Sequence, residues 1–428
     1  MITMAKKIAE GVQLKYIKTD KFKTNYISIN FISPLTKESA HFNSLIPLVL
    51  MRGSRNYPTQ ADINKRLQFL YSGDVVSRNT NFGEYQIFGA KANMLNNRFA
   101  SDVDIAMETI ELLCDIIFNP LVNNDEFETS YTEGEKISLI DTIQAEINEK
   151  GRYAVKRLMS EMCKNEVYGI SKLGSVEDVK AINGKSLYDA YKKALRTLPI
   201  EIYLVGEYDF DKVASKFENV FSGMEREPIK IEEAGIICEV EGVKQVEDVE
   251  KVKQGKLVLG FRTCYEPKEN RYHLMQLFNE IYGGSPTAKL FINVREKMSL
   301  CYYCRSSISQ RSGIMLVSSG IEAKNKKIAE KAILEQLEKI QMGEITVEEF
   351  ESARKSIKNG YMQIYDSAEL MEAWVFFRSL CNISTTPMLE CEKIDNTTIK
   401  DIQEISKRIK LDTVYFLRGE EKGDDIDG

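Results

Sequence analysis

Apolar and polar residues alternate in two short segments that lie far apart in the chain. In residues 26–31 every second position is apolar, which predicts a β-strand that buries Ile27, Ile29 and Phe31 on one face. Residues 257–261 repeat the same alternation 230 positions later. The repeat suggests that the strand and its surroundings occur twice in this chain.

The segments that follow the two predicted strands are also similar. Each strand leads into a helical stretch that ends at a glycine, Gly53 in the first case and Gly283 in the second. Further apolar positions with helical spacing match at a separation of 223 residues: Ile105 with Ile328, and Phe127 with Phe350. Matches that keep one order along the chain predict an internal duplication.

We therefore expect an α+β fold made of two similar α/β halves. Strand-like runs at 200–206 and 314–321 alternate irregularly with longer amphipathic helices, which favours mostly antiparallel sheets packed with helices. The predicted domain bounds are a first half at 1–222, an exposed linker at 223–250, a second half at 251–420 and an acidic tail at 421–428.

Composition and charge exclude several classes of function. The chain is 43% hydrophobic and 29% charged, with a net charge of −6, so no basic field attracts nucleic acid. The longest apolar run, residues 45–51, is far shorter than the ~18 residues that cross a bilayer. The first residues lack the apolar core of a secretory signal, and eight cysteines are too sparse for a disulfide scaffold. We expect a cytoplasmic protein without a membrane span.

Histidine and cysteine are the residue types that most constrain the chemistry. Only His41 and His273 occur, and we take this scarcity to exclude a catalytic site that needs two histidines from this chain alone. We interpret His41 as a structural or surface residue, because it is a lone histidine with no second histidine at helical spacing. Cys301 and Cys304 form a solitary C-x-x-C. On a strand their thiols point to opposite faces, and no second pair lies nearby, which disfavours metal or redox use.

Residues 282–302 carry the most informative pattern, a glycine turn followed by a helix and a strand. The helix is expected to bury Leu290, Phe291 and Val294, with Arg295 at its end and Tyr302 seven residues later in the strand. An arginine and a tyrosine that converge can donate hydrogen bonds to a carbonyl oxygen or to its developing oxyanion. The alternative is a surface arginine beside a half-buried strand tyrosine.

This segment resembles the second half of pitrilysin/insulinase-type peptidases, the inverzincins. Gly-Gly-Ser, Leu-Phe, Arg-Glu-Lys and Ser-Leu-Cys-Tyr follow one another as in that family, with Cys301 where alanine is usual. The resemblance extends over nearly the whole chain and implies two similar halves that form one half of a clamshell chamber. It also implies substrate contacts at Gly283, Gly284 and Ser285, and catalytic roles for Arg295 and Tyr302.

The first half departs from the family where zinc would bind. The family carries His-x-x-Glu-His before a glycine and a more distant glutamate ligand. Aligned on Gly53, the motif positions are Ser44, Pro47 and Leu48, and the distant glutamate is replaced by Thr142. The resemblance therefore implies a degenerate motif and no metal bound by this chain.

Three functions remain open. The first is the zinc-less, YfmF-type subunit of a heterodimeric peptidase, in which a zinc-motif subunit of YfmH type, or a second copy of this chain, completes the site for a peptide substrate. For this reading the resemblance implies zinc on the partner and a role in peptide maturation or elongation factor P modification. The second is a catalytically inactive peptide-binding or scaffold protein. The third, a hydrolase with Cys301 or Cys304 as nucleophile, lacks an evident base. Retention of both Arg295 and Tyr302 favours the first.

Overall fold

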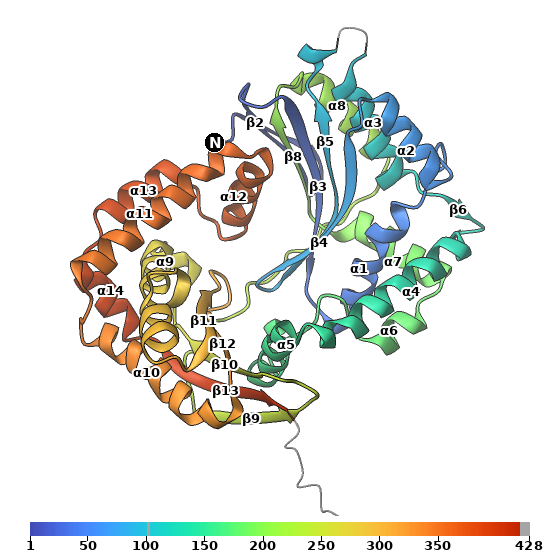
Figure 1. Cartoon of the computed structure of the whole chain (residues 1–428). Helices are drawn as coiled ribbons and strands as arrows, with labels where there is room; N and C mark the ends of the chain where they lie inside the picture. The colour runs from blue at the N-terminus through green and yellow to red at the C-terminus, as the bar shows by residue number, and fades with distance from the viewer. Residues whose placement is uncertain (101–102, 420–428) are drawn as a thin grey trace, which may run out of the picture. The chain divides into compact units, whose positions relative to one another are not determined.

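The computed structural model describes residues 1–100 and 103–419 (Figure 1). Contacts divide the chain into two compact units. Unit 1 comprises residues 1–144, 170–233 and 364–380, and unit 2 comprises residues 145–169, 234–363 and those from 381 onward. Each unit is thus assembled from three separate stretches of sequence.

Unit 1 contains a six-stranded sheet in the order β1-β2-β8-β3-β5-β4. Only the β2–β8 pair is parallel, and the remaining pairs are antiparallel. The strands are β1 (Met4–Ala9), β2 (Val12–Lys18), β3 (Thr24–Pro34), β4 (Asp74–Phe82), β5 (Tyr85–Leu95) and β8 (Ile200–Gly206). A separate short hairpin pairs β6 (Val122–Asn123) with β7 (Glu126–Phe127). The predicted alternation at 26–31 lies in the buried centre of β3.

Helices cover both faces of this sheet. The main core of unit 1 packs Ile27, Ile29 and Phe31 against helices on one face, as predicted. The helices of unit 1 are α1 (Lys37–Leu50), α2 (Gln60–Phe69), α3 (Ile105–Phe118), α4 (Thr129–Ala145), α6 (Val176–Ala181), α7 (Gly184–Thr197), α8 (Phe210–Phe221) and α12 (Ala368–Leu380). The last of these lies on the opposite face, against β3 and β8.

Unit 2 contains a five-stranded sheet in the order β11-β12-β10-β13-β9. Its one parallel pair is β13–β9. The strands are β9 (Lys244–Val249), β10 (Gly255–Arg262), β11 (Cys301–Ile308), β12 (Ile314–Ile321) and β13 (Lys410–Arg418). Strand β9 lies inside the expected linker 223–250. This part of the linker forms a strand because its backbone completes the ladder beside β13.

The helices of unit 2 also lie on both faces of its sheet. They are α5 (Lys150–Met162), α9 (Tyr272–Asn279), the π-helical turns η5 (Glu280–Gly284) and η6 (Leu290–Lys297), α10 (Lys326–Gln341), α11 (Val347–Gln363), α13 (Pro387–Asp395) and α14 (Ile399–Ser406). Helix α5 packs its apolar residues Ala154, Leu158 and Met162 against Val258 of β10 and Tyr415 of β13.

The two sheets confirm the internal duplication. Around the matching strands β3 and β10, the orders β8-β3-β5-β4 and β13-β10-β12-β11 correspond, and each continues with one parallel strand beyond β8 or β13. The fold is α+β with mostly antiparallel sheets, as expected. The clamshell arrangement stays a prediction.

The contact-based units differ from a simple cut at the expected linker because two helices are exchanged. Helix α5, from the first sequence half, belongs to unit 2, and α12, from the second half, belongs to unit 1. Each supplies apolar residues that one face of the recipient sheet needs. The expected acidic tail, residues 421–428, lies outside the described residues. In the described part of the chain no helix is long and apolar enough to cross a membrane.

Candidate functional site

The positions predicted to form a degenerate zinc motif lie on α1, where they take part in a neutral hydrogen-bond network. Ser44 is buried, donates to the carbonyl oxygen of Lys172 at 2.6 Å and accepts from the Asn79 amide at 2.7 Å. Pro47 is buried within the helix, and Leu48 is partly buried. These positions supply one hydroxyl and two side chains without any donor atom for a metal.

Gln86 of β5 extends this network. Its amide nitrogen donates to the carbonyl oxygens of Ala40 at 3.1 Å and Lys172 at 2.9 Å, while its amide oxygen accepts from Asn43 at 3.1 Å. Neutral amides satisfy one another here, so the site needs no cation to be stable.

Thr142, at the position of the distant glutamate, is exposed on α4 and donates to the carbonyl oxygen of Ser138 at 2.8 Å. His41 is buried, and burial lowers its pKa. Within residues 1–100 and 103–419, no group of three or more histidine, cysteine, aspartate or glutamate side chains is placed to hold a metal ion. The first half therefore lacks the donor set of the zinc peptidases.

Arg295 lies in η6 and turns toward the start of β11. Leu290 and Val294 of η6 are buried as predicted, whereas Phe291 is only partly buried, with the Arg295 guanidinium 4.5 Å from its ring centroid. Arg295 also pairs with Glu296 at 3.4 Å and is 37% exposed. Its guanidinium is held against an aromatic ring while its donors still reach solvent.

Tyr302 occupies a β-bulge at the beginning of β11. Cys301 pairs with Ile321 and Tyr303 with Gly320, so Tyr302 is the extra residue of the bulge. Its side chain is 64% exposed. Bulges re-aim side chains, and this one presents the tyrosine outward. Among the described residues no hydrogen bond joins Tyr302 and Arg295, although η6 packs against β11, so the convergence of the two side chains stays a prediction.

The same bulge overturns the expectation for the C-x-x-C pair. Because of the extra residue, Cys301 and Cys304 are both buried on one face of β11 instead of pointing to opposite faces. A hydrogen bond from Cys304, helped by Ser319 and the charge of Arg295, lowers the pKa of Cys301 to about 7. The hydrogen bond to Cys301 and burial raise the pKa of Cys304. The prediction of separated thiols was wrong.

The cysteines nevertheless have no histidine as a base. His273 lies on α9 and lines a separate cavity of about 570 Å³, to which neither cysteine contributes. Burial lowers its pKa to about 4. A nucleophilic hydrolase built on Cys301 with His273 therefore lacks the required hydrogen bond between nucleophile and base.

The predicted substrate-binding residues form the turn before η6. A Cβ on Gly283 would stand 2.6 Å from Leu290 and 2.8 Å from the Ser306 backbone, so glycine lets this turn approach β11. Ser285 donates to the carbonyl oxygen of Glu280 at 3.1 Å. A Cβ on Gly284 would stand 2.6 Å from the Asn279 amide. These contacts position η6 and hence Arg295; substrate contact at the turn stays a prediction.

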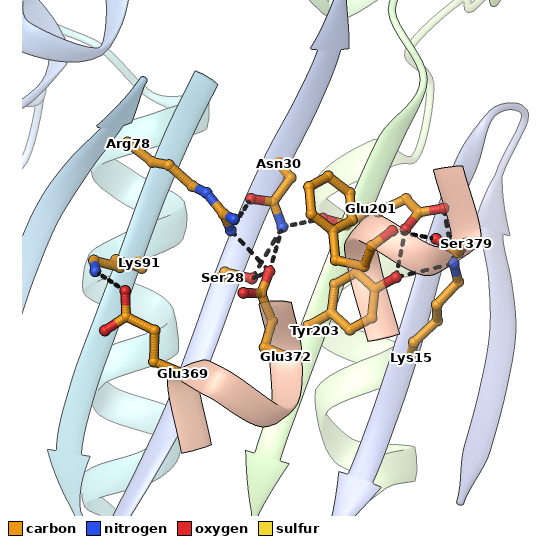
Figure 2. A network of polar contacts seen from close by, with 11 residues as sticks. Lys15, Ser28, Asn30, Arg78, Lys91, Glu201, Tyr203, Glu369, Glu372 and Ser379 are labelled. Carbon is orange, nitrogen blue, oxygen red and sulfur yellow. Dashed lines mark hydrogen bonds and ion pairs between the residues drawn. The ribbon is translucent and has the colours of Figure 1, made fainter. Parts of the chain in front are cut away.

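A buried polar network on the sheet of unit 1 was not anticipated from the sequence (Figure 2). Glu372 of α12 is fully buried and accepts from Arg78 at 2.8 Å and from Ser28 at 3.1 Å. Arg78 also donates to Asn30 at 2.7 Å. The polar positions of β3 gave a signal, but their partner stands more than 300 residues away in the sequence, and alternation alone cannot locate it.

Comparison with known proteins shows what the chain is similar to. Residues 181–357 match the family described as Peptidase M16 inactive domain. The chain is 34% identical over 412 residues to the probable inactive metalloprotease YmfF of Bacillus subtilis (strain 168), covering 96% of both chains. It is 22% identical to the antilisterial bacteriocin subtilosin biosynthesis protein AlbE of the same organism, covering 95% of this chain and 100% of that protein.

Solved structures agree with the fold. The crystal structure of a conserved protein from Enterococcus faecalis V583 superposes with a TM-score of 0.92 at 29% identity, covering 98% of this chain and 99% of that one. The match includes both halves, so the whole architecture described above occurs in a solved relative.

Proposed function

Since this chain belongs to the peptidase M16 family, we propose that it is a zinc-less subunit that completes the site of a zinc-bearing M16 chain. In this proposal it is not a peptidase alone. It binds peptide and supplies hydrogen-bond donors, while the partner, a zinc-motif relative, holds the metal and activates water.

One contrast within the chain carries the proposal. The metal positions of the first half are filled by the neutral Ser44 network, whereas the second half keeps Arg295 and Tyr302 accessible to solvent. The similarity to a probable inactive metalloprotease over nearly its full length supports the same reading. A chain that retained neither half of the chemistry would have no reason to keep an arginine and a tyrosine in these positions.

The proposed roles follow from the chemistry of the two side chains. The Arg295 guanidinium and the Tyr302 hydroxyl are both hydrogen-bond donors, so together they can hold the oxygen of a peptide carbonyl. As the carbonyl carbon becomes tetrahedral, both hydrogen bonds strengthen on the developing oxyanion. Removing one such donor typically costs about 3 kcal/mol of transition-state stabilisation.

The test is isolation of the protein from its native cell with whatever M16 chain accompanies it, followed by zinc analysis and a peptidase assay. We expect zinc on the partner, none on this chain, and activity only for the complex. Arg295→Gln and Tyr302→Phe should each lower kcat about a hundredfold with assembly unchanged. Tyr71→Phe, at another exposed tyrosine, is the matched control and should leave kcat unchanged. Stoichiometric zinc on this chain alone would contradict the proposal.

A catalytically inactive peptide-binding or scaffold role is the second candidate. It is favoured because, among the described residues, Arg295 pairs with Glu296 and no hydrogen bond joins it to Tyr302. Full activity of both variants in the complex would establish it in place of the first candidate.

For the biological substrate we propose only a class, peptides that undergo maturation. Similarity to AlbE, whose name places that protein in bacteriocin biosynthesis, supports a role in peptide maturation. Elongation factor P modification and a cytoplasmic location stay predictions from the sequence.

A further inference from the structure

A cavity of about 880 Å³ opens in unit 2 between the start of α5, the loop before β10 and the strands β10, β11 and β12. Seven of the residues that line it are lysine or arginine, and one, Glu149, is acidic. The chain as a whole carries a net charge of −6. A strongly basic hollow in an acidic protein is a local segregation of charge that the overall composition does not predict.

Three of these cations come from α5 and its first turn, and each has a neighbouring carboxylate. Lys150 stands 3.3 Å from Glu250, Arg152 pairs with Glu149 at 3.1 Å, and Lys156 pairs with Glu146. All three pairs are partly or largely exposed, so water weakens them and the side chains can turn toward another anion.

The other four cations have no ion pair among the described residues. Lys251 and Lys253 extend from the exposed loop before β10. Lys256 of β10 lies 5.5 Å from the ring centroid of Tyr303, and burial lowers its pKa. Arg305 lies two residues beyond Tyr303 on β11 and also lines the cavity.

Arg262, on the same sheet, is a buried arginine whose charge is neutralised by carboxylates. It is 3% exposed and donates to Glu166 at 2.7 Å and to Asp412 at 2.7 Å. Arg305 receives no such carboxylate. Gathering unneutralised like charges around one cavity costs free energy, which an anionic ligand would recover.

The walls between the cations suggest which anion fits. Val155, Val252 and the ring of Tyr303 lie among the charged side chains, so the cavity alternates apolar and basic surface. Its volume is in the range of sites that take several residues or a drug-sized ligand, well beyond a single phosphate. Dispersed lysines with intervening apolar side chains suit carboxylates that are spaced along a peptide.

We propose that this cavity, the cationic pocket, binds an acidic segment of a peptide, with aspartate or glutamate side chains paired to Lys256, Arg305 and the lysines of the loop. The inference rests on the proposed function only in taking peptide as the ligand. Arg305 in the pocket and Tyr302, the proposed carbonyl donor, lie on the same edge strand, β11. In this proposal the pocket favours acidic peptides for the site at that strand.

The test measures binding of a fluorescein-labelled decapeptide with four glutamates to the full chain by fluorescence anisotropy. The same peptide with glutamines is the ligand control. We expect at least tenfold weaker binding of the glutamine peptide, and a loss of affinity for the glutamate peptide when salt rises from 0.05 to 0.5 M, as charge pairing requires (about 1.4 kcal/mol per tenfold).

Two variants locate the binding. Lys256→Gln with Arg305→Gln should weaken binding of the glutamate peptide about tenfold or more, since the double variant loses two charge-assisted hydrogen bonds. Lys251→Gln with Lys253→Gln, in the exposed loop, is the variant least able to disturb folding. The matched control is Lys324→Gln with Lys331→Gln, which removes the same charge from side chains that are 79% and 80% exposed outside the pocket.

Equal binding of the two peptides, or equal weakening by the control variant, would overturn the inference. Displacement of the peptide by inorganic tripolyphosphate at much lower concentration than by unlabelled peptide would also overturn it, in favour of a phosphate ligand. These measurements use the chain alone, so they can succeed even if no zinc-bearing partner exists. Conversely, a complex whose cleavage rates ignore substrate acidity would retain the proposed function and refute the pocket.

Discussion

The two exchanged helices bring opposite charges to the sheets that they cover. Helix α12 places Glu372 against Arg78 and Glu369 against Lys91 on the sheet of unit 1 (Figure 2). Helix α5 instead adds lysines and an arginine beside the unpaired Arg305 on the sheet of unit 2. One architecture thus neutralises the cations of one sheet and accumulates them over the other.

The residues at corresponding places in the two central strands explain how this is possible. Ser28 and Asn30 of β3 are polar and hydrogen-bond to the network of Glu372, whereas Val258 and Gly260 stand 230 positions later in β10. A Cβ on Gly260 would stand 2.6 Å from Met162 of α5, so that helix docks by close apolar packing. Since α5 meets β10 through apolar contacts, the exposed cations at its rim are not required for that packing and can turn to a ligand.

The largest expected effect on stability comes from removing the buried ion pair of unit 1. Glu372→Ala leaves the Arg78 guanidinium, which is 13% exposed, without its carboxylate, and should lower the free energy of unfolding by about 3 kcal/mol in urea titrations. The control is Glu369→Ala, at a carboxylate that is 51% exposed, which should cost about 0.5 kcal/mol. Similar losses for the two variants would show that Arg78 is solvated after all.

The second prediction compares the single histidine of each unit. Burial lowers the pKa of His273 to about 4, below its unfolded value near 6.5, so the unfolded chain takes up a proton first as pH falls. Stability should be intact above pH 6.5 and should fall between pH 6.5 and 4. Partial exposure of the ring reduces this loss to about 2 kcal/mol.

His273→Gln should flatten that part of the pH dependence of unfolding, measured in urea at pH 7.5 and pH 4.5. His41→Gln is the counterpart in unit 1 and should have a smaller effect in the same direction, because burial lowers its pKa less. An unchanged pH dependence for His273→Gln would assign acid sensitivity to the carboxylates instead.

Much of the fold follows from local pattern. The runs 200–206 and 314–321 coincide with β8 and β12, and the apolar face of residues 26–31 is buried as predicted. The repeat predicted two similar sheets because each half keeps its own alternation. The helix exchange could not be predicted, since α5 and α12 have ordinary amphipathic patterns that do not specify which sheet they cover.

The candidate site divides in the same way. The predicted loss of ligands at Ser44, Pro47, Leu48 and Thr142 needs only residue types once the family motif is aligned on Gly53, so the sequence was enough to make that prediction. The orientation of Cys301 could not be predicted in this way, because one unpaired residue in β11 reverses the alternation on which that prediction relied. The cationic pocket could not be predicted from the sequence either, since its charged residues come from three separate segments.

The third prediction places a carboxylate beside an arginine on the sheet of unit 2, as Glu372 lies beside Arg78 on the sheet of unit 1. Ser318 lies directly across from Arg305 in the β11–β12 ladder, so Ser318→Asp places an acid opposite the arginine. We expect about 0.5 kcal/mol of added stability in urea and weaker binding of the glutamate peptide. Ser318→Asn is the neutral control, and equal effects of the two substitutions would refute a charge-based account of the pocket.

The smallest predicted effect concerns how closely Arg295 approaches β11. Its charge contributes to lowering the pKa of Cys301, so Arg295→Gln should raise that pKa from about 7. The measurement is the pH dependence of Cys301 alkylation by iodoacetamide, resolved from the other cysteines by peptide mass spectrometry. Arg305→Gln removes an equal charge from the same strand, but no effect of Arg305 on Cys301 is expected, because its side chain lines the cationic pocket on the opposite face. A shift of the alkylation midpoint only for Arg295→Gln would show that the guanidinium lies close to Cys301, the residue next to Tyr302, in solution. Equal alkylation midpoints for both variants would show that Arg295 and Tyr302 do not lie together.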